Sequence, residues 1–268
     1  MSCSLLRLLT VTVHGVAQLG DYLYIIAFDS PPKVGIYDIS DRQLAATIEL
    51  PDIDHPIDIV ACQKSQRVYV ADFTCIWWVP PDGNYEVWLQ AEFPTPVLSS
   101  VSVTNGRLLV TSYMYQQLLL YNEEKERIAR VNLPTYMMPL HAAESPSLGT
   151  IILSHAGTFT DLTKCEEDFF QICEVGINGE ILRTFGDPDY TSHVGLQTPQ
   201  YIALDSGGRL FVADSGKRRV LLINSDFQLE CVVAENLESD PHRLCYDEQS
   251  GLLTVSDLTG CVSVFNIS

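Results

Sequence analysis

The sequence predicts an all-β protein, a six-bladed β-propeller with four-stranded antiparallel blades. Short apolar segments rich in β-branched and aromatic residues alternate with turns of Gly, Pro, Asp and Ser along the chain, as expected for strands joined by turns. Helical periodicity is absent, and the strand–turn pattern recurs six times, at intervals of about 40 to 60 residues that are typical of blades. A β-sandwich array is the alternative fold.

The clearest copy of the repeat is residues 199–223. Segments 201–204, 209–214 and 219–223 have strand composition, and Gly207-Gly208 and Ser215-Gly216 supply the turns between them. Glycine and serine are favoured there because turns need conformations that other residues adopt poorly. The remaining units are approximate copies of this one.

The six units form one domain, 1–268, and open at Val13, Pro56, Pro96, Pro139, Pro199 and Pro241. The predicted blades are 13–52, 56–93, 96–136, 139–190, 199–238 and 241–267. Second strands are expected at 24–27, 68–72, 108–112, 151–155, 210–214 and 252–257, and fourth strands at 45–50, 86–89, 128–133 and 228–233. The sixth unit has no fourth strand of its own, and residues 4–10 have the composition to supply it. That pairing would close the ring and leave no open sheet edge.

The composition excludes some partners. The 268 residues carry a formal net charge of −18, and phosphate contacts need clustered Lys and Arg, so nucleic acid is not an expected partner. No apolar run has the length of a membrane helix, and residues 1–13 contain Arg7 and lack a cleavage site, which favours a strand over a signal peptide. We expect a cytoplasmic protein that does not bind membranes.

The eight cysteines include no CxxC pair, and several lie in apolar strand patterns. Buried free thiols in a reducing compartment are therefore the prediction. Cys165 and Cys173 lie in one irregular segment and are the pair to test for a disulfide or a metal.

The repeats carry Pro-x-x-apolar-Ala near their start and Val-Ala-Asp at the end of the second strand. This pattern resembles NHL repeats, most clearly at 199–223 and least at 139–186. The whole chain is similar to single-domain NHL-like proteins of marine invertebrates, a likeness that implies no activity. Related propellers include protein- or RNA-binding domains, peptidylglycine amidating lyase, gluconolactonases and paraoxonases, so the resemblance implies the fold more than a function.

The starts of the first strands are expected to surround the top mouth of the central channel, where the links between blades lie. The first position after each opening holds His14, Ile57, Val97, Leu140, Gln200 and His242, and the second holds Gly15, Asp58, Leu98, His141, Tyr201 and Arg243. The ends of the second strands bring Asp72, Ser112, His155, Asp214 and Asp257 to the same face. This concentration of ionisable groups predicts a small-molecule site.

The residue types suggest acid–base chemistry of lyase or hydrolase type. His141 or His14 would be the base, Tyr201 the acid and Arg243 an anion clamp, with Asp58 orienting a histidine. The structural interpretation is that Asp72, Asp214 and Asp257 only hold turns through backbone hydrogen bonds, and that the other polar groups line a hydrated pore.

A metal-assisted site is an open alternative. The resemblance to peptidylglycine amidating lyase implies zinc on His14, His141 and His242, although His141 is offset by one position, which turns a strand side chain to the other face. A calcium site would need oxygen ligands such as Asp58, Asp72 and Asp214. Either ion, or none, is compatible with the sequence.

Two functions from different classes remain open. The first is a small-molecule site in the channel, and the second is a protein-interaction module of NHL type without catalysis. Unit four is the longest, and its extra segments 157–170 and 186–198 are expected on the top face, where they would cover the mouth as a lid or form a surface insertion.

Overall fold

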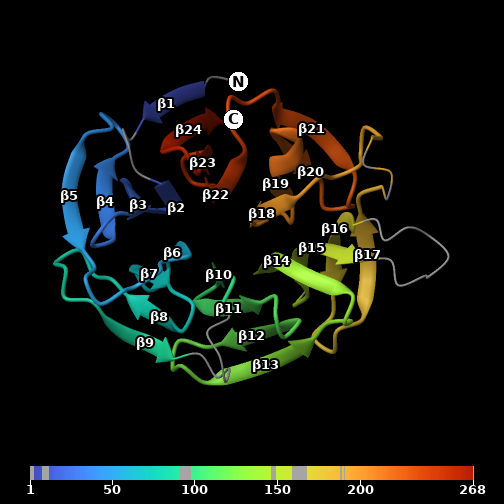
Figure 1. The fold of residues 1–268 in the computed structure, drawn as a ribbon, viewed down its shortest axis with the longest axis horizontal. Coiled ribbons are helices and arrows are strands. Elements are labelled where there is room, and N and C mark those ends of the chain that lie inside the picture. The colour runs from blue at the N-terminus through green and yellow to red at the C-terminus, as the bar shows by residue number, and fades with distance from the viewer. Residues whose placement is uncertain are drawn as a thin grey trace.

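The computed structural model describes residues 3–7, 12–90, 98–145, 149–158, 168–187, 189 and 191–267. It contains six four-stranded antiparallel sheets, arranged radially as the blades of a propeller around a central channel (Figure 1). The predicted fold class is confirmed, and the described part of the chain has one helical turn, η1 (Ser215–Lys217).

Each of blades one to three is a run of four consecutive strands. Blade one contains β2 (Thr12–Leu19), β3 (Tyr22–Phe28), β4 (Lys33–Asp38) and β5 (Leu44–Glu49). Blade two contains β6 (Asp58–Cys62), β7 (Arg67–Ala71), β8 (Cys75–Trp78) and β9 (Glu86–Gln90). Blade three contains β10 (Ser100–Thr104), β11 (Arg107–Ser112), β12 (Gln117–Tyr121) and β13 (Arg127–Asn132).

Blades four and five follow the same order, and the last blade combines the two ends of the chain. Blade four contains β14 (Met137–Glu144), β15 (Ile151–Thr158), β16 (Asp168–Val175) and β17 (Ile181–Phe185). Blade five contains β18 (Pro199–Leu204), β19 (Leu210–Asp214), β20 (Arg219–Ile223) and β21 (Leu229–Ala234). Blade six contains β22 (Pro241–Asp247), β23 (Leu252–Asp257), β24 (Cys261–Asn266) and β1 (Cys3–Arg7).

The N-terminal strand closes the ring as predicted. β1 pairs antiparallel with β24, with Cys3 opposite Phe265 and Arg7 opposite Cys261. Figure 1 shows β1 alongside β24, on the outer side of blade six. The pairing gives β24 a partner on its outer side, as the predicted closure requires.

The hydrophobic core lies between neighbouring blades. One buried cluster joins Ile26 and Val34 of blade one to Ile59 and Val70 of blade two, and equivalent clusters occupy the other five blade interfaces. Each sheet therefore buries both faces, which is why its inner strands are almost continuously apolar. The packed blades hold the first strands β2, β6, β10, β14, β18 and β22 around the channel (Figure 1).

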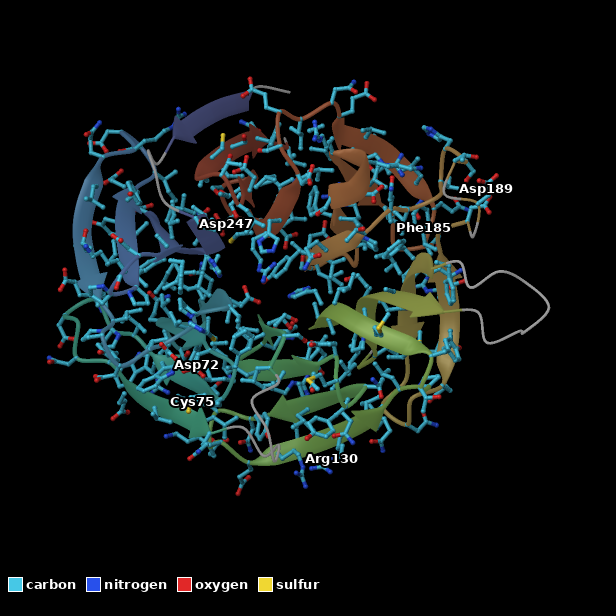
Figure 2. The ribbon with its side chains drawn as sticks, viewed as in Figure 1. Asp72, Cys75, Arg130, Phe185, Asp189 and Asp247 are labelled. Carbon is cyan, nitrogen blue, oxygen red and sulfur yellow. The ribbon has the colours of Figure 1, made fainter. Side chains whose placement is uncertain are left out.

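The molecule has two faces. The top face carries the links between blades and the turns between second and third strands, and the bottom face carries the turns between first and second strands. The described residues of the predicted lid segment 186–198 do not cover the channel. Lys217 donates to the Ser192 and Gly195 carbonyls, and Arg219 to those of His193 and Gly195, and Asp189 lies at the outer rim (Figure 2). Most of the other predicted lid segment, residues 159–167, lies outside the described residues.

Candidate functional site

The first strands place one residue each at a common depth in the channel. The residue after the opening of blades one, four, five and six is a β-bulge, so the pairing with the second strand resumes at the next residue. We call these next residues and their equivalents in blades two and three the ring positions. They are Gly15, Asp58, Ser100, His141, Tyr201 and Arg243, opposite Ile26, Ala71, Thr111, Ser154, Ala213 and Ser256.

The ring residue of blade three differs from the prediction. Leu98 follows Pro96 at the predicted spacing, but Ser100 pairs with Thr111 as Asp58 pairs with Ala71. The strand of blade three therefore begins two residues later than its proline indicates. Ser100 is buried, and its hydroxyl has no hydrogen-bond partner among the described residues.

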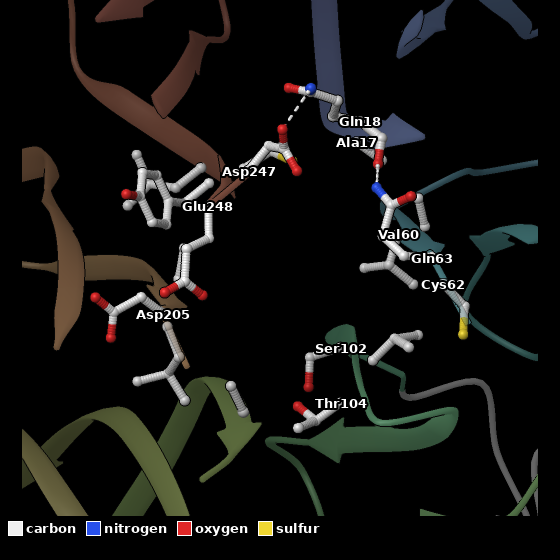
Figure 3. Close-up of a pocket in the computed structure, with 18 of the residues that line it drawn as sticks. Ala17, Gln18, Val60, Cys62, Gln63, Ser102, Thr104, Asp205, Asp247 and Glu248 are labelled. Carbon is white, nitrogen blue, oxygen red and sulfur yellow. Dashed lines mark hydrogen bonds between the residues drawn. The ribbon is translucent and has the colours of Figure 1, made fainter. Parts of the chain in front are cut away.

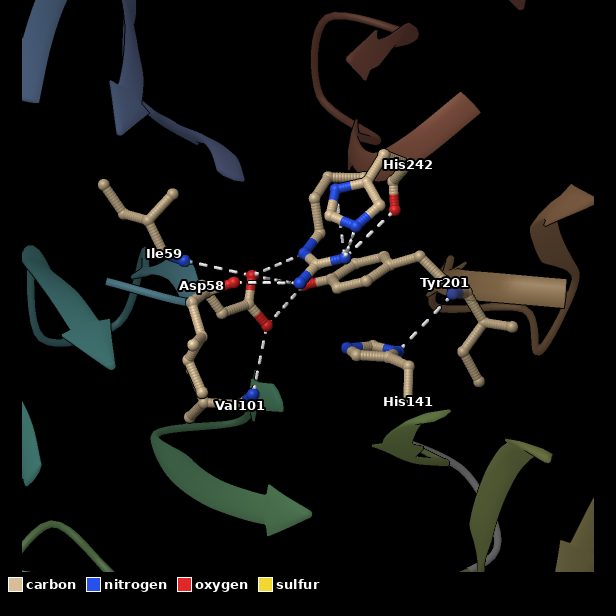
Figure 4. Close-up of polar contacts among 9 residues, drawn as sticks. Asp58, Ile59, Val101, His141, Tyr201 and His242 are labelled. Atoms are coloured by element: carbon tan, nitrogen blue, oxygen red, sulfur yellow. Dashed lines mark hydrogen bonds and ion pairs between the residues drawn. The ribbon is translucent and has the colours of Figure 1, made fainter. Parts of the chain in front are cut away.

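Asp58 lies at the centre of the ring contacts (Figure 4). Its carboxylate accepts hydrogen bonds from the backbone N–H groups of Ile59 at 3.0 Å and Val101 at 3.1 Å. The Tyr201 hydroxyl lies 3.4 Å from both carboxylate oxygens, and Arg243 Nε lies 3.4 Å from Oδ1. Asp58 thus connects blade two to blades three, five and six.

Arg243 spans from blade six to blade two, past blade one. Its Nη2 donates to the Ile57 carbonyl at 2.8 Å, and Nη1 donates to the His242 carbonyl at 3.2 Å. Its Nε makes an ion pair with Asp58 but lacks the alignment of a hydrogen bond. Gly15, the ring residue of blade one, has no side chain in this region. A Cβ there would lie 2.9 Å from the Ile59 backbone nitrogen and 2.7 Å from its Cγ2, so only glycine fits.

The aromatic ring of Tyr201 contacts one side chain from each neighbouring blade. The His141 imidazole stacks on it, with ring centroids 3.6 Å apart and planes inclined by 26°. The Arg243 guanidinium lies 5.1 Å from the Tyr201 ring centroid, a cation–π geometry. The Ile202 N–H donates to His141 Nδ1 at 3.4 Å, so the neutral ring carries its proton on Nε2.

Burial sets the protonation of these groups. Burial raises the pKa of Asp58 to about 6, although Arg243, the two backbone N–H groups and Tyr201 all act to lower it. Burial, together with the charge of Asp58, raises the pKa of Tyr201 well above its usual value. Burial and Arg243 lower the pKa of His141 well below its usual range, which keeps the imidazole neutral. Asp58 is therefore the group of the three that exchanges a proton near neutral pH.

The four ionisable ring residues do not surround an open mouth, which corrects the sequence-based expectation. Asp58 is 0%, His141 1%, Tyr201 4% and Arg243 6% exposed. Their side chains reach across the channel and contact one another because Gly15 and the small Ser100 occupy the remaining ring positions. We call Asp58, His141, Tyr201 and Arg243 the plug.

A cavity of about 530 Å³ extends along the channel from the plug to the bottom face. His141 and Tyr201 line its inner end. Its walls include the residues two positions after each ring residue, which face the same side of the strand. They are mostly small: Ala17, Val60, Ser102, Ala143, Ala203 and Cys245. Gln18, Gln63, Thr104, Asp205, Asp247 and Glu248 line the bottom mouth (Figure 3).

Two polar groups at the inner part of this cavity lack partners. His141 Nε2 and Ser102 Oγ have no hydrogen-bond partner among the described residues, and both side chains are more than nine-tenths buried. A contact with the Val101 backbone acts to raise the His141 pKa, against the larger effects of burial and of Arg243. This contact does not have the geometry of a hydrogen bond to Nε2. Buried polar groups are nearly always hydrogen-bonded, so these two groups lack the hydrogen bonds that burial usually requires.

The three predicted metal ligands do not converge. No group of three His, Cys, Asp or Glu side chains among the described residues has the arrangement of a metal site. His14 and His242 occupy bulge positions, whereas His141 is at a ring position, stacked on Tyr201. The His14 ring packs on Phe28, and both His242 ring nitrogens lie within 3.3 Å of Arg243 Nη1. Burial, then Arg243 and His14, lower the His242 pKa to about 2.

The aspartates at the ends of the second strands hold turns. Asp72 accepts from the N–H groups of Thr74 and Cys75, the Thr74 hydroxyl and the Trp77 indole. Asp257 accepts in the same way from Thr259 and from the Cys261 N–H. Asp214 binds the Gln197 N–H and Arg219. These residues lie one strand behind the channel wall and do not line the cavity, and Asp72 is well away from its centre (Figure 2).

Ser112 and His155 also lie behind the channel wall. Both are fully buried and do not line the cavity. His155 Nε2 lies 3.2 Å from the Cys173 sulfur, inside blade four. Burial raises the Cys173 pKa to about 12, so this thiol is protonated and unreactive. Its predicted partner Cys165 lies outside the described residues.

No protein-family model matches the chain, and no curated protein matches it. Solved β-propeller structures do. Hydrazine synthase from Kuenenia stuttgartiensis is 14% identical, with a TM-score of 0.68 over 95% of this chain and 83% of the other. Virginiamycin B lyase from Staphylococcus aureus is 13% identical, with a TM-score of 0.66 over 98% of each chain. The WD40 propeller domain of Doa1 is 13% identical, with a TM-score of 0.67 over 99% and 96%.

At these identities the likeness shows the fold alone. The NHL assignment rests on the repeat motif and stays a prediction. The described part of the chain has no helix with the length and hydrophobicity of a membrane span.

Proposed function

We propose that the protein binds a small molecule in the central channel, through the bottom mouth, and carries out acid–base chemistry on it at the plug. The observation that supports this most directly is the pair of unpartnered buried atoms, His141 Nε2 and Ser102 Oγ, in a cavity of about 530 Å³. Cavities of this size are typical of small-molecule sites, which combine mostly apolar walls with a few polar groups.

The plug residues have separable roles in this proposal. His141 and Tyr201 line the cavity and contact the ligand, with Nε2–H of His141 binding an oxygen atom that gains negative charge. Asp58 is the base, because its pKa of about 6 suits proton transfer near neutral pH. A proton removed from the ligand reaches Asp58 through the Tyr201 hydroxyl, 3.4 Å away. The positive charge of Arg243 compensates the negative charge of the buried, ionised Asp58.

An elimination of lyase type can begin with removal of a proton from the ligand, and a hydrolysis can begin with removal of a proton from a water molecule that attacks the ligand. Two of the structural neighbours are lyases, virginiamycin B lyase and streptogramin B lyase. The fold is therefore compatible with lyase chemistry, although identities of 13% and 11% carry no further argument.

The test is a thermal-shift screen of a metabolite collection against the full chain and against Ala203→Trp, which fills the channel. A ligand present at 100 times its Kd stabilises the folded state by about 2.7 kcal/mol. At least one compound is expected to raise the Tm of the wild type and of Ala46→Trp, an exposed control on β5, without affecting Ala203→Trp. If every stabilising compound acts equally on all three proteins, the channel is not the site.

A second candidate, protein binding on the top face, is favoured by a row of four aromatic side chains, of which the last three are exposed. His14, Phe28, His55 and Phe73 follow one another with centroids 5.4, 5.7 and 6.0 Å apart, and Phe28 and Phe73 are 43% and 41% exposed. Exposed carboxylates such as Asp29 and Asp54 lie beside the row.

We propose that a partner protein would contribute apolar and basic side chains to this row. In a pull-down, Phe28→Ser with Phe73→Ser would release the partner, whereas Tyr22→Ser, an exposed control on the bottom face, would retain it. Retention by both variants would exclude this surface.

A further inference from the structure

The bottom mouth of the channel is acidic. Asp205, Asp247 and Glu248 line it, and Lys64 is the one cationic side chain among the described lining residues. Lys64 is engaged elsewhere, in an ion pair of 2.7 Å with Glu123. A mouth lined by one sign of charge raises the local concentration of ligands of the opposite sign.

Two of these carboxylates have no cationic partner among the described residues. Asp205 pairs with Arg209 at 2.7 Å. Asp247 accepts hydrogen bonds from the Gln18 side chain and the Ser250 N–H, and Glu248 accepts from Ser206, all uncharged donors. Their charge is therefore available to a ligand at the mouth (Figure 3).

The inner end of the same cavity has different requirements. The Ile202 N–H donates a hydrogen bond to His141 Nδ1, so the proton of His141 is on Nε2, which has no partner among the described residues. The Ser102 hydroxyl beside the channel is a second donor without a partner there. Arg243 behind the stacked rings adds positive charge. An oxygen acceptor on the ligand would satisfy both groups. Between the two ends the wall is lined by apolar residues such as Ala17, Val60, Ala143 and Ala203.

We infer that the channel ligand is an amine, with its ammonium group at Asp247 and Glu248, a short apolar body, and an oxygen acceptor directed at His141 and Ser102. This inference rests on the proposed function and specifies its substrate class. A carboxylate ligand would place like charges together at the mouth, and a neutral ligand would leave Asp247 and Glu248 without a counter-charge.

The test uses two sets of probes that share a hydroxyl group at one end, as the oxygen acceptor, and differ in the charge of the group at the other end. The amine 6-amino-1-hexanol, the alcohol 1,6-hexanediol and the carboxylate 6-hydroxyhexanoate form one set, and 4-amino-1-butanol, 1,4-butanediol and 4-hydroxybutanoate form the other. Binding to the full chain is measured by calorimetry in low salt for the wild type, for Asp247→Asn with Glu248→Gln, and for Ala203→Trp. The Asn and Gln side chains keep acceptor oxygens for the existing donors, so the double variant is expected to fold.

The amines are expected to bind the wild type at least about tenfold more tightly than the alcohols, or 1.4 kcal/mol, and the carboxylates most weakly. The double variant should reduce the amine preference to less than about threefold and leave the alcohols unchanged, and Ala203→Trp should abolish binding of all probes. Equal binding of amines and alcohols that is lost in Ala203→Trp would overturn the amine inference and leave the channel as the site. Binding that Ala203→Trp does not affect, or no binding at all, would count against the proposed function itself.

Discussion

Replacing Asp58 by Asn is expected to stabilise the protein at high pH. Burial raises the Asp58 pKa from 3.8 to about 6. A carboxyl group with a raised pKa binds its proton more tightly in the folded state, so its favourable contribution is present at low pH and is lost as the pH rises from about 3.8 to about 6. The ionised carboxylate in the plug therefore destabilises the wild type at neutral pH, and an uncharged isostere removes that effect.

The magnitude follows from the pKa. At about 1.4 kcal/mol per pH unit, the rise to about 6 corresponds to about 3 kcal/mol at pH 8 and to about half of that at pH 5. Asn has one acceptor oxygen, so the hydrogen bond from either Ile59 or Val101 is lost, at about 1 kcal/mol. The variant should be about 0.5 kcal/mol more stable than the wild type at pH 5 and about 2 kcal/mol more stable at pH 8.

Urea unfolding of both proteins between pH 5 and pH 8 measures this difference, because the titration of groups that are distant from Asp58 cancels in the comparison. Glu49→Gln at an exposed position is the control, expected within about 0.5 kcal/mol of the wild type. A loss of about 3 to 5 kcal/mol in Asp58→Asn at pH 8, the usual result of breaking a stabilising buried ion pair, would refute the reasoning.

Three further predictions follow from the same geometry. Gly15→Ala should lower the free energy of unfolding by about 1 to 3 kcal/mol, because the new Cβ meets the Ile59 backbone; unchanged urea unfolding would contradict the close approach of β2 and β6. Asp72→Ala should destabilise by at least about 2 kcal/mol through the loss of its turn hydrogen bonds, yet leave the Kd of any channel ligand unchanged, and a weakened Kd would place Asp72 in the site. Turnover of a channel substrate should rise with pH through about 6 as Asp58 ionises, and a rate that falls over this range would exclude Asp58 as the base.

The fold could be predicted because each repeat carries its own local signals. Gly207-Gly208 and the strands around it define blade five without reference to the rest of the chain. The closure by β1 was predictable because the sixth unit has only three strands. The exception is blade three, where Pro96 does not mark the strand start and pairing alone identifies Ser100.

The site was less predictable because its geometry depends on distances across the channel. The sequence brings Asp58, His141, Tyr201 and Arg243 to one level, but only the structure shows that Arg243 reaches Ile57 past Gly15 and that the four side chains contact one another. The cavity on the bottom side was missed. The sequence does indicate the cavity, because the residues two positions after each ring residue are mostly small. Ser102, Ala143 and Ala203 are examples, and their small side chains leave space in the channel.

The acidic mouth was also missed. Asp247 and Glu248 lie in a turn, where acidic residues are common, so their sequence context does not distinguish a binding role. Their lack of a cationic partner is visible only in the folded protein.

The central claim is that the channel between the plug and the bottom face holds a small-molecule ligand. The most direct measurement is a crystal structure of the full chain grown with the compound that the thermal-shift screen selects. The account predicts density for that compound in the cavity, with an oxygen atom within hydrogen-bond distance of His141 Nε2 and Ser102 Oγ. Density for the compound at any other place on the molecule, with the channel holding only water, would contradict it.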